Sequence, residues 1–203
     1  MTDHDPVAKK PGLRQRKIER TRRQIAEAAL NAFLERGYES ATLEQIAEAA
    51  DVHKRTLLRY FPTKAHLVLY NQHAALEEFR VAARERGTRS IVDVWSDHVI
   101  FHSKDLSRRG PAANVRQITA SEPAVRQAYS DISAAYQEII ATELEAELGS
   151  DLGSRIKARV AAAAFAAGNY SVGAMIMKHS DYASLEMAER EVLRLVIEGV
   201  LSA

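Results

Sequence analysis

The sequence predicts an all-α protein with a small N-terminal domain of three helices and a larger C-terminal helical bundle, about nine helices in all. Glycine and proline are scarce, with 9 and 5 among 203 residues, whereas strong helix formers abound. Apolar residues recur at intervals of three and four in segment after segment, which is the period of an amphipathic helix. No stretch shows the sustained period-2 alternation of β-branched residues that predicts strands.

Composition excludes several classes of protein. The chain has no cysteine, so disulfides, zinc-thiolate sites and cysteine nucleophiles are all excluded. No apolar run approaches the roughly 20 residues of a membrane span. Residues Met1 to Arg16 are polar and basic without the apolar stretch of a secretory signal, so we expect a cytoplasmic protein with no membrane partner.

Charge is distributed unevenly along the chain. Residues 1–64 contain 13 Lys and Arg against 9 Asp and Glu, and the remainder contains 15 against 18. Eight basic residues and one acid lie between Lys9 and Arg23. A basic front suits a chain that touches a polyanion with one end, although a solvated tail without function has the same composition.

The first helix shows a clear apolar face and a clear end. Its inward residues follow helical spacing: Ile25, Ala28, Ala29, Ala32 and Phe33. Thr21 and Gln24 have the spacing of a capping box, while the sequence also allows a start as early as Arg14. Gly37 ends the helix, because glycine adopts the left-handed conformation without steric cost.

Two short helices follow, joined by a tight turn. Thr42 and Gln45 fit a second capping box, which predicts a helix of about two turns. Asp51 stands where the turn needs a left-handed residue, a conformation that Asp tolerates better than most side chains. His53 is the expected N-cap of the next helix, Lys54 to Tyr60, which stops before Pro62.

The remainder reads as a succession of longer helices. The first extends from about Thr63 to about Arg86 and ends near Gly87. Prolines at the first turn and glycines in the loops mark several later ends. The predicted segments are Arg89–Lys104, Pro111–Ala120, Pro123–Leu148, Ser154–Lys178 and Ser184–Leu201.

A helix-turn-helix is the arrangement that these spacings favour. The apolar residues of the two short helices can close on the first helix, which leaves Lys54, Arg55, Leu58 and Arg59 facing outward. Arg and Lys can bond guanine O6 and N7, and an exposed aliphatic side chain can touch a thymine methyl. Leu58 on a solvent face is more natural in a DNA groove than on a plain surface helix.

The first third of the chain resembles the DNA-binding domain of the TetR/AcrR family of repressors. Two runs carry the resemblance: RTRRQIAEAALNAFLERGYESAT from Arg20 to Thr42, and ATLEQIAEAADVHKRTLLRYFPTKAHLV from Ala41 to Val68. Three positions depart from the pattern, because Asp51 replaces the usual glycine, His53 the usual Ser or Thr, and Leu58 the usual aromatic residue. These departures leave the fold in place but prevent any operator sequence from being borrowed by analogy.

The resemblance implies a set of DNA contacts. Thr42, Tyr60 and Lys64 would bind phosphates, and His53 would do so when protonated, although a neutral exposed cap is the simpler role for it. Base contacts would come from the outward face of the second short helix, and flanking phosphates or a minor groove would meet Arg20 and Arg23 in the first. The implied domains are a basic flexible arm (1–15), a helix-turn-helix domain (16–64) and a ligand-binding and dimerisation domain (65–203).

The same resemblance implies a homodimer that binds a palindromic double-stranded operator as a repressor. The run VAAAAFAAGNYSVGAMIM after Arg159 is apolar nearly all round, and such a helix must be covered on more than one side. With the last helix, it could form a four-helix interface about a two-fold axis, or the two could simply pack inside one monomer.

A small-molecule effector is expected in the C-terminal domain. Pockets combine apolar walls with a few polar groups, and the candidates of this kind are Trp95, His98, His102, Tyr136, Asn169, Tyr170 and Met175. The alternative is that these are core aromatics and satisfied core polar groups. No metal or cofactor is expected, although His98 and His102 have the i, i+4 spacing of metal ligands.

Two other functions are alternatives to a ligand-responsive regulator. An enzyme is disfavoured, since the sequence has no glycine-rich phosphate loop, no GxSxG and no metal triad. Carboxylates such as Glu143, Glu145 and Glu147 are expected to be solvated. A DNA-binding protein without an inducer remains open, and a ligand-sized cavity would distinguish it.

Overall fold

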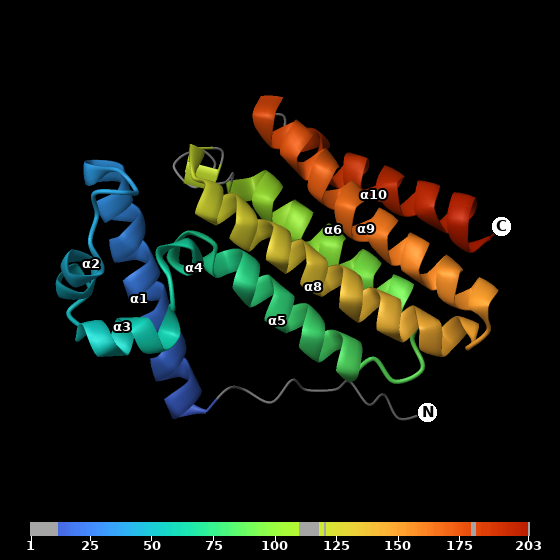
Figure 1. Ribbon diagram of the computed structural model, residues 1–203, viewed down its shortest axis with the longest axis horizontal. Helices are drawn as coiled ribbons and strands as arrows, with labels where there is room; N and C mark the ends of the chain where they lie inside the picture. The colour runs from blue at the N-terminus through green and yellow to red at the C-terminus, as the bar shows by residue number, and fades with distance from the viewer. Residues whose placement is uncertain (1–11, 110–117, 120, 180–181, 203) are drawn as a thin grey trace, which may run out of the picture. The chain divides into compact units, whose positions relative to one another are not determined.

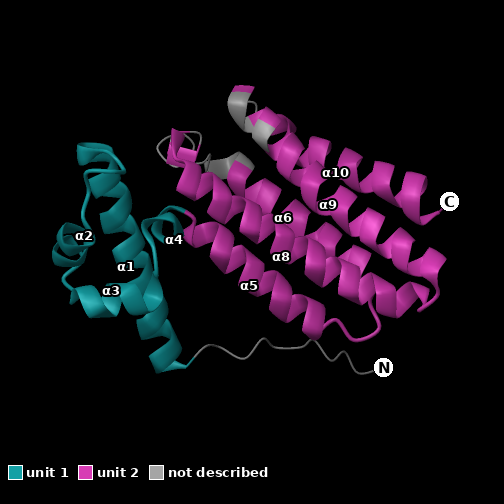
Figure 2. Ribbon diagram, in the orientation of Figure 1, with its two compact units in different colours: residues 1–68 teal, residues 69–203 magenta. Residues whose placement is uncertain are grey.

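The computed structural model describes residues 12–109, 118–119, 121–179 and 182–202. Within these residues the chain forms nine α-helices and no strand, so the predicted all-α class is confirmed. The chain divides into two compact units, residues 1–68 and 69–203 (Figures 1 and 2). The predicted segment Pro111–Ala120 lies almost entirely outside the described residues.

Unit 1 is built on one long helix. Helix α1 (Leu13–Arg36) packs against α2 (Leu43–Ala49) and α4 (Lys64–Val68), and α2 packs against α3 (Lys54–Tyr60). Its core is closed by fully or almost fully buried side chains from every helix: Ile25, Ala29, Phe33, Ile46, Leu57, Phe61 and Leu67. Gly37 ends α1 with φ of 83°, as predicted.

Two predictions about the ends of helices in this region are wrong. Thr21 is not an N-cap, because α1 begins eight residues earlier at Leu13 and the Thr21 hydroxyl donates to the Lys17 carbonyl within the helix. Gln24 instead reaches out of α1 and donates to the Ala50 carbonyl at 3.0 Å. The helix expected from Thr63 to Arg86 is broken at Leu69, where α4 ends and α5 (Tyr70–Arg84) begins.

Unit 2 is a bundle of long helices. Helix α5 packs on α6 (Ile91–Arg109) and α8 (Pro123–Leu148), and α9 (Leu152–His179) packs on α8 and α10 (Leu185–Val196). A short 3-10 turn precedes α10, and a π-helical turn (Ile197–Leu201) follows it. Figure 1 shows α6, α8, α9 and α10 running side by side. Helix α6 extends to Arg109, five residues past its predicted end at Lys104, and α9 begins at Leu152, two residues before its predicted start at Ser154.

Ion pairs fix one end of this bundle. Arg86, in the loop after α5, lies 2.8 Å from carboxylate oxygens of both Glu143 and Glu147. Glu147 also accepts a hydrogen bond from the Ile91 backbone N–H at 2.8 Å. These acids were expected to be solvated, and the expectation is wrong because Arg86 brings the α5–α6 loop onto the C-terminal end of α8.

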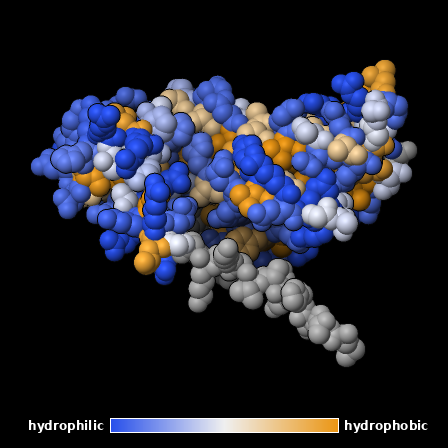
Figure 3. Space-filling model, turned by 90° about the horizontal axis from the view of Figure 1, so that it is seen from below, coloured by the Kyte–Doolittle hydropathy of each residue, from blue (hydrophilic) through white to orange (hydrophobic). Residues whose placement is uncertain are grey.

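The surface mixes polar and apolar side chains. On the face shown in Figure 3, hydrophobic atoms lie in small groups among hydrophilic ones. The large apolar side chains that are at least half exposed include Leu152, Ile156, Phe101, Met187 and Leu195. None of the described helices has a stretch hydrophobic enough to serve as a transmembrane segment.

Candidate functional site

The start of α2 is held by a complete capping box. The Thr42 hydroxyl oxygen accepts from the Gln45 backbone N–H at 3.2 Å, and the Gln45 side chain accepts from the Thr42 N–H at 3.1 Å. The predicted box is therefore confirmed. Because the hydroxyl acts here only as an acceptor, its proton is left to bond an external acceptor.

The turn from α2 to α3 has the hydrogen-bond pattern of a Schellman motif. The Asp51 N–H donates to the Glu48 carbonyl at 3.0 Å, and the Val52 N–H donates to the Ala47 carbonyl at 2.9 Å. Asp51 has φ of 49°, and it is the one described residue other than glycine with positive φ. The left-handed residue predicted at this position is therefore confirmed, and it sets the direction in which α3 leaves the turn.

Helix α3 has one buried and one open face. Leu57 is fully buried and Phe61 nearly so, which anchors the helix on unit 1. Lys54, Arg55 and Arg59 are exposed, and Leu58 is 38% exposed. The open face therefore carries cationic and aliphatic side chains, and both types are able to contact base edges in a major groove. His53 occupies the N-cap position without a side-chain capping bond.

The basic side chains around α3 differ in what they contact. Lys54 forms a short ion pair with Glu44 of α2, which holds the pKa of that carboxyl below its usual value. Arg59 lies over the Tyr60 ring, 4.9 Å from its centroid, and donates to its hydroxyl at 3.2 Å. Arg55 makes no hydrogen bond or ion pair with any of the described residues, so its guanidinium is the one best placed to accept a new partner.

Lys64 is engaged by its own unit. Its ammonium donates to the backbone carbonyls of Tyr38 and Glu39, both at 2.9 Å, and lies 5.3 Å from the centroid of the Tyr38 ring. These contacts tie the start of α4 to the loop after α1. An ammonium has three protons, so one remains for a phosphate.

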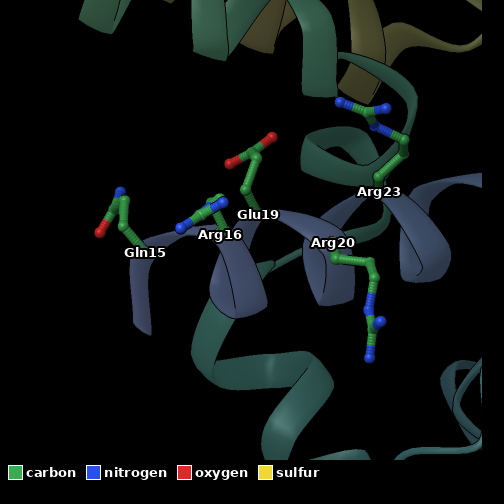
Figure 4. A pocket seen from close by; sticks show the side chains of 5 residues that line it. All are labelled: Gln15, Arg16, Glu19, Arg20 and Arg23. Atoms are coloured by element: carbon green, nitrogen blue, oxygen red, sulfur yellow. The ribbon is translucent and has the colours of Figure 1, made fainter. Parts of the chain in front are cut away.

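Helix α1 carries a row of polar side chains near its start. Gln15, Arg16, Glu19, Arg20 and Arg23 line a shallow open hollow (Figure 4). Figure 4 shows Arg20 and Arg23 pointing to different sides of the helix. The two predicted contact residues therefore do not converge on one point, although the row is strongly basic with a single acid.

Five of the seven predicted ligand residues meet in the centre of unit 2. Phe79, Trp95, His98 and Tyr136, here called the aromatic cluster, have ring centroids 5.1 to 5.9 Å apart. The Tyr136 hydroxyl and His98 Nε2 are 3.1 Å apart. The His102 ring lies 4.4 Å from the His98 ring, and Asn169 joins through Trp95. Sequence reasoning missed Phe79, which α5 supplies.

Burial determines the charge of this cluster. Desolvation, helped by the neighbouring His102, lowers the pKa of His98 to about 3, so the imidazole is neutral at physiological pH. Desolvation also lowers the pKa of His102, against the opposing charges of Glu78 and Asp105. Burial raises the pKa of the Tyr136 phenol. The centre of the unit is therefore an uncharged aromatic environment with hydrogen-bonding groups.

A hydrogen-bonded row of three side chains crosses the interior beside the aromatic cluster. The Trp95 indole N–H donates to Asn169 Oδ1 at 3.3 Å, and the Asn169 amide donates to Glu189 Oε2 in a short bond. Asn169 and Glu189 are only 8% and 6% exposed. Sequence reasoning missed Glu189, although its spacing from Leu185 and Val192 places it on the buried face of α10.

The other two predicted ligand residues lie apart from the aromatic cluster. The Tyr170 ring packs on the Tyr129 ring with centroids 5.0 Å apart, and Tyr170 is 43% exposed. Met175 is 53% exposed on α9. No group of three or more His, Asp or Glu side chains suited to a metal occurs among the residues described.

Comparison with known proteins gives the same result for the N-terminal unit. Residues 25–70 match the model of the bacterial regulatory proteins of the tetR family. The transcriptional regulator TcmR of Streptomyces glaucescens is 51% identical over 75 residues, which are 37% of this chain and 33% of TcmR. RutR of Escherichia coli K12 is 30% identical over 130 residues, 64% of this chain and 52% of RutR. The chain thus spans a third to about half of these relatives.

Solved structures resemble the chain over most of its length. SmeT, the repressor of the Stenotrophomonas maltophilia efflux pump SmeDEF, aligns with a TM-score of 0.62 at 18% identity, covering 88% of this chain and 89% of SmeT. NalD, a repressor from Pseudomonas aeruginosa, aligns with a TM-score of 0.59 at 19% identity, covering 90% and 98%. At these identities the likeness concerns the fold. Residues 25–70 therefore form a DNA-binding domain of the tetR-family type, and the chain as a whole shares the helical fold of these solved repressors.

Proposed function

We propose that the protein is a transcriptional repressor that binds a palindromic operator as a homodimer and is released by a small molecule. The observation that carries the proposal is α3, which buries Leu57 and presents Lys54, Arg55, Leu58 and Arg59 to solvent. A helix braced in this way can enter the major groove with several side chains free to reach base edges.

Phosphate contacts beside α3 would set its register on the DNA. The Thr42 hydroxyl and one proton of the Lys64 ammonium are left over by the contacts within unit 1. The Tyr60 hydroxyl accepts from Arg59 and keeps its own proton for a phosphate. Arg20 and Arg23 extend the basic surface along α1. Such contacts give affinity, while the α3 side chains give sequence preference.

Exposed apolar residues on α9 and α10 support dimerisation through these helices. Leu152, Ile156 and Val160 follow one another at intervals of four on α9, and Leu195 is 56% exposed on α10. A Val160→Glu change should convert a dimer to monomers in sedimentation analysis. Val81→Glu on α5, where the valine is equally exposed at 49%, is the matched control and should leave the dimer intact.

The aromatic cluster offers a route from ligand to DNA. Phe79 of α5 contacts the rings of Trp95, His98 and Tyr136, so a ligand that parts these rings has to shift α5. A single residue, Leu69, separates the end of α4 from the start of α5, and α4 begins at Lys64. A preference of about 1 to 3 kcal/mol for the released arrangement changes DNA occupancy about 5- to 150-fold.

DNA binding tests the proposal directly. Affinity for the DNA flanking the gene is measured by anisotropy in a salt titration, for the wild type, Arg55→Ala, Tyr60→Phe and Arg84→Ala. Tight binding that weakens steeply with salt is expected, and the first two changes should weaken it. Arg84→Ala removes the same charge from exposed α5 and should have no effect. Equal affinity for flanking and random DNA would contradict the proposal at this locus.

A further inference from the structure

Glu189 is a buried carboxyl group without a cation beside it. It is 6% exposed, whereas the other described acids of α10, Glu186 and Glu191, are paired with arginines. Among the residues that the structure describes, Asn169 is its one hydrogen-bond donor and no Lys, Arg or His lies within ion-pair distance. Buried carboxylates are normally paired, because desolvating an isolated charge is costly.

The hydrogen bonds around Glu189 all run toward it. An indole N–H can only donate, so Trp95 fixes the Asn169 amide with its oxygen toward the indole and its NH2 group toward Glu189. Glu189 Oε2 therefore accepts a hydrogen bond from the Asn169 amide, and such a bond favours the carboxylate over the protonated acid. Burial acts in the opposite direction and raises the pKa of Glu189 to about 7.

The second oxygen of the carboxyl group lies beside Gly173. A Cβ atom on Gly173 of α9 would lie 3.6 Å from Glu189 Oε1. The rings of Tyr129 and Tyr170 pack at a tilt, with centroids 5.0 Å apart. Burial, with smaller contributions from Tyr170 and Glu189, raises the pKa of Tyr129 to about 12, so Glu189 acts electrostatically on this ring pair. An acceptor oxygen beside aromatic faces suits a cation with an apolar body.

We propose that the effector is an organic cation with an aromatic or apolar body, and that Glu189 binds its positive charge. This inference rests on the proposed ligand-responsive function and specifies the class of ligand. Glu189 Oε1 accepts from the cationic group, the Tyr129 and Tyr170 rings contact the body, and the Trp95–Asn169 pair holds the carboxylate in place. A neutral or anionic ligand of the same shape gains nothing from the charge of Glu189.

Three probes with one ring and spacer test the charge preference: 2-phenylethylammonium, 2-phenylethanol and 3-phenylpropionate. Binding is followed by the fluorescence of Trp95, the one tryptophan of the chain, which bonds Asn169 directly. The ammonium ion should bind at least about tenfold more tightly than the alcohol, and the carboxylate most weakly. No saturable binding of the ammonium ion, or equal binding of all three probes, would overturn the proposal.

Two variants test whether Glu189 is the group that binds the positive charge of the ligand. Glu189→Gln keeps the shape and should lose the preference for the ammonium ion, whereas Glu186→Gln, on the exposed side of α10 beside Arg190, should bind within about twofold of the wild type. Affinity of the wild type should fall about tenfold from pH 8 to pH 6, because protonation of Glu189 competes with the cation. The other groups near it, Tyr129 and His98, do not titrate in this range. Unchanged affinity in Glu189→Gln would refute the assignment.

The same titrations separate this inference from the proposed function. DNA affinity of each variant is measured without probe, and then with saturating 2-phenylethylammonium. Cation binding through Glu189 without release of DNA would leave the inference standing and contradict ligand-responsive repression. Release of DNA by a neutral ligand, with the ammonium ion inert, would contradict the inference and leave the repressor intact.

Discussion

The turn at Asp51 predicts which of two substitutions, glycine or alanine, gives the more stable protein. Asp51 has φ of 49° and an exposed side chain, and its N–H and that of Val52 close the turn. Replacing Asp51 with glycine or alanine keeps both backbone bonds. The two variants then differ in how readily their backbone adopts the left-handed conformation, and in the entropy of their unfolded chains.

The magnitudes favour glycine at this position. A left-handed conformation costs a residue with a Cβ about 1–2 kcal/mol, and alanine gains about 0.4–1 kcal/mol over glycine by restricting the unfolded chain. Asp51→Gly should therefore be more stable than Asp51→Ala by about 0.5–1 kcal/mol. At Ser40, an exposed turn residue whose φ is not positive, the order should reverse, with alanine more stable than glycine.

Hydrogen exchange measures this difference where it arises. The chain has two compact units, so a single global unfolding transition is not assumed. Exchange of the backbone amides in residues 43–60 reports the opening free energy of unit 1 for all four variants. A result in which alanine is more stable than glycine at both Asp51 and Ser40 would refute the assignment of strain to this turn.

Three further predictions concern other parts of the chain. Gly168→Ala should lower the free energy of unfolding by about 1–3 kcal/mol, because its Cβ would stand 2.8 Å from a Val192 methyl carbon. Chemical denaturation should show a smaller loss for the same change in a Val192→Ala background, and an equal loss would count against the clash. Glu44→Gln should free Lys54 and raise the affinity for random DNA severalfold in anisotropy titrations; an unchanged affinity would show that the ion pair does not restrain Lys54. The pKa of Glu189 is raised from 4.5 to about 7, so its stabilising contribution is complete below pH 4.5 and is lost as the pH rises through 7. The free energy of unfolding of the wild type should therefore fall by about 3 kcal/mol relative to that of Glu189→Gln between these limits. Parallel profiles of unfolding free energy against pH for the two proteins would exclude this linkage.

The ends of several elements follow from local chemistry and were predictable. Gly37, the capping box at Thr42 and the left-handed Asp51 each solve a backbone problem within a few residues. Helix α8 has the predicted bounds, with a proline in its first turn and Gly149 after its end. At such positions the neighbouring sequence alone decides the backbone conformation.

Features that depend on tertiary contacts were not predictable in the same way. The break at Leu69 has no proline or glycine to mark it, and Leu69 is fully buried, so packing overrides a continuous helical pattern. The spacing of Gln24 from Thr21 predicts a capping role, but in the folded protein the Gln24 side chain bonds the Ala50 carbonyl instead. Glu189 carries a spacing signal, but its bond to Asn169 depends on the packing of α10 against α9.

Helix α3 is proposed to read base sequence, and the specificity of DNA binding tests this role more directly than affinity does. After selection of bound genomic fragments, the ratio of operator to random-DNA affinity is measured for the wild type, Arg55→Ala and Arg84→Ala. We predict a ratio of roughly 10³ or more for the wild type, and the same ratio for Arg84→Ala. Arg55→Ala should lose about 1–3 kcal/mol of discrimination at one base pair of each half-site. A wild-type ratio near one, or an Arg55→Ala ratio equal to that of the wild type, would contradict the account.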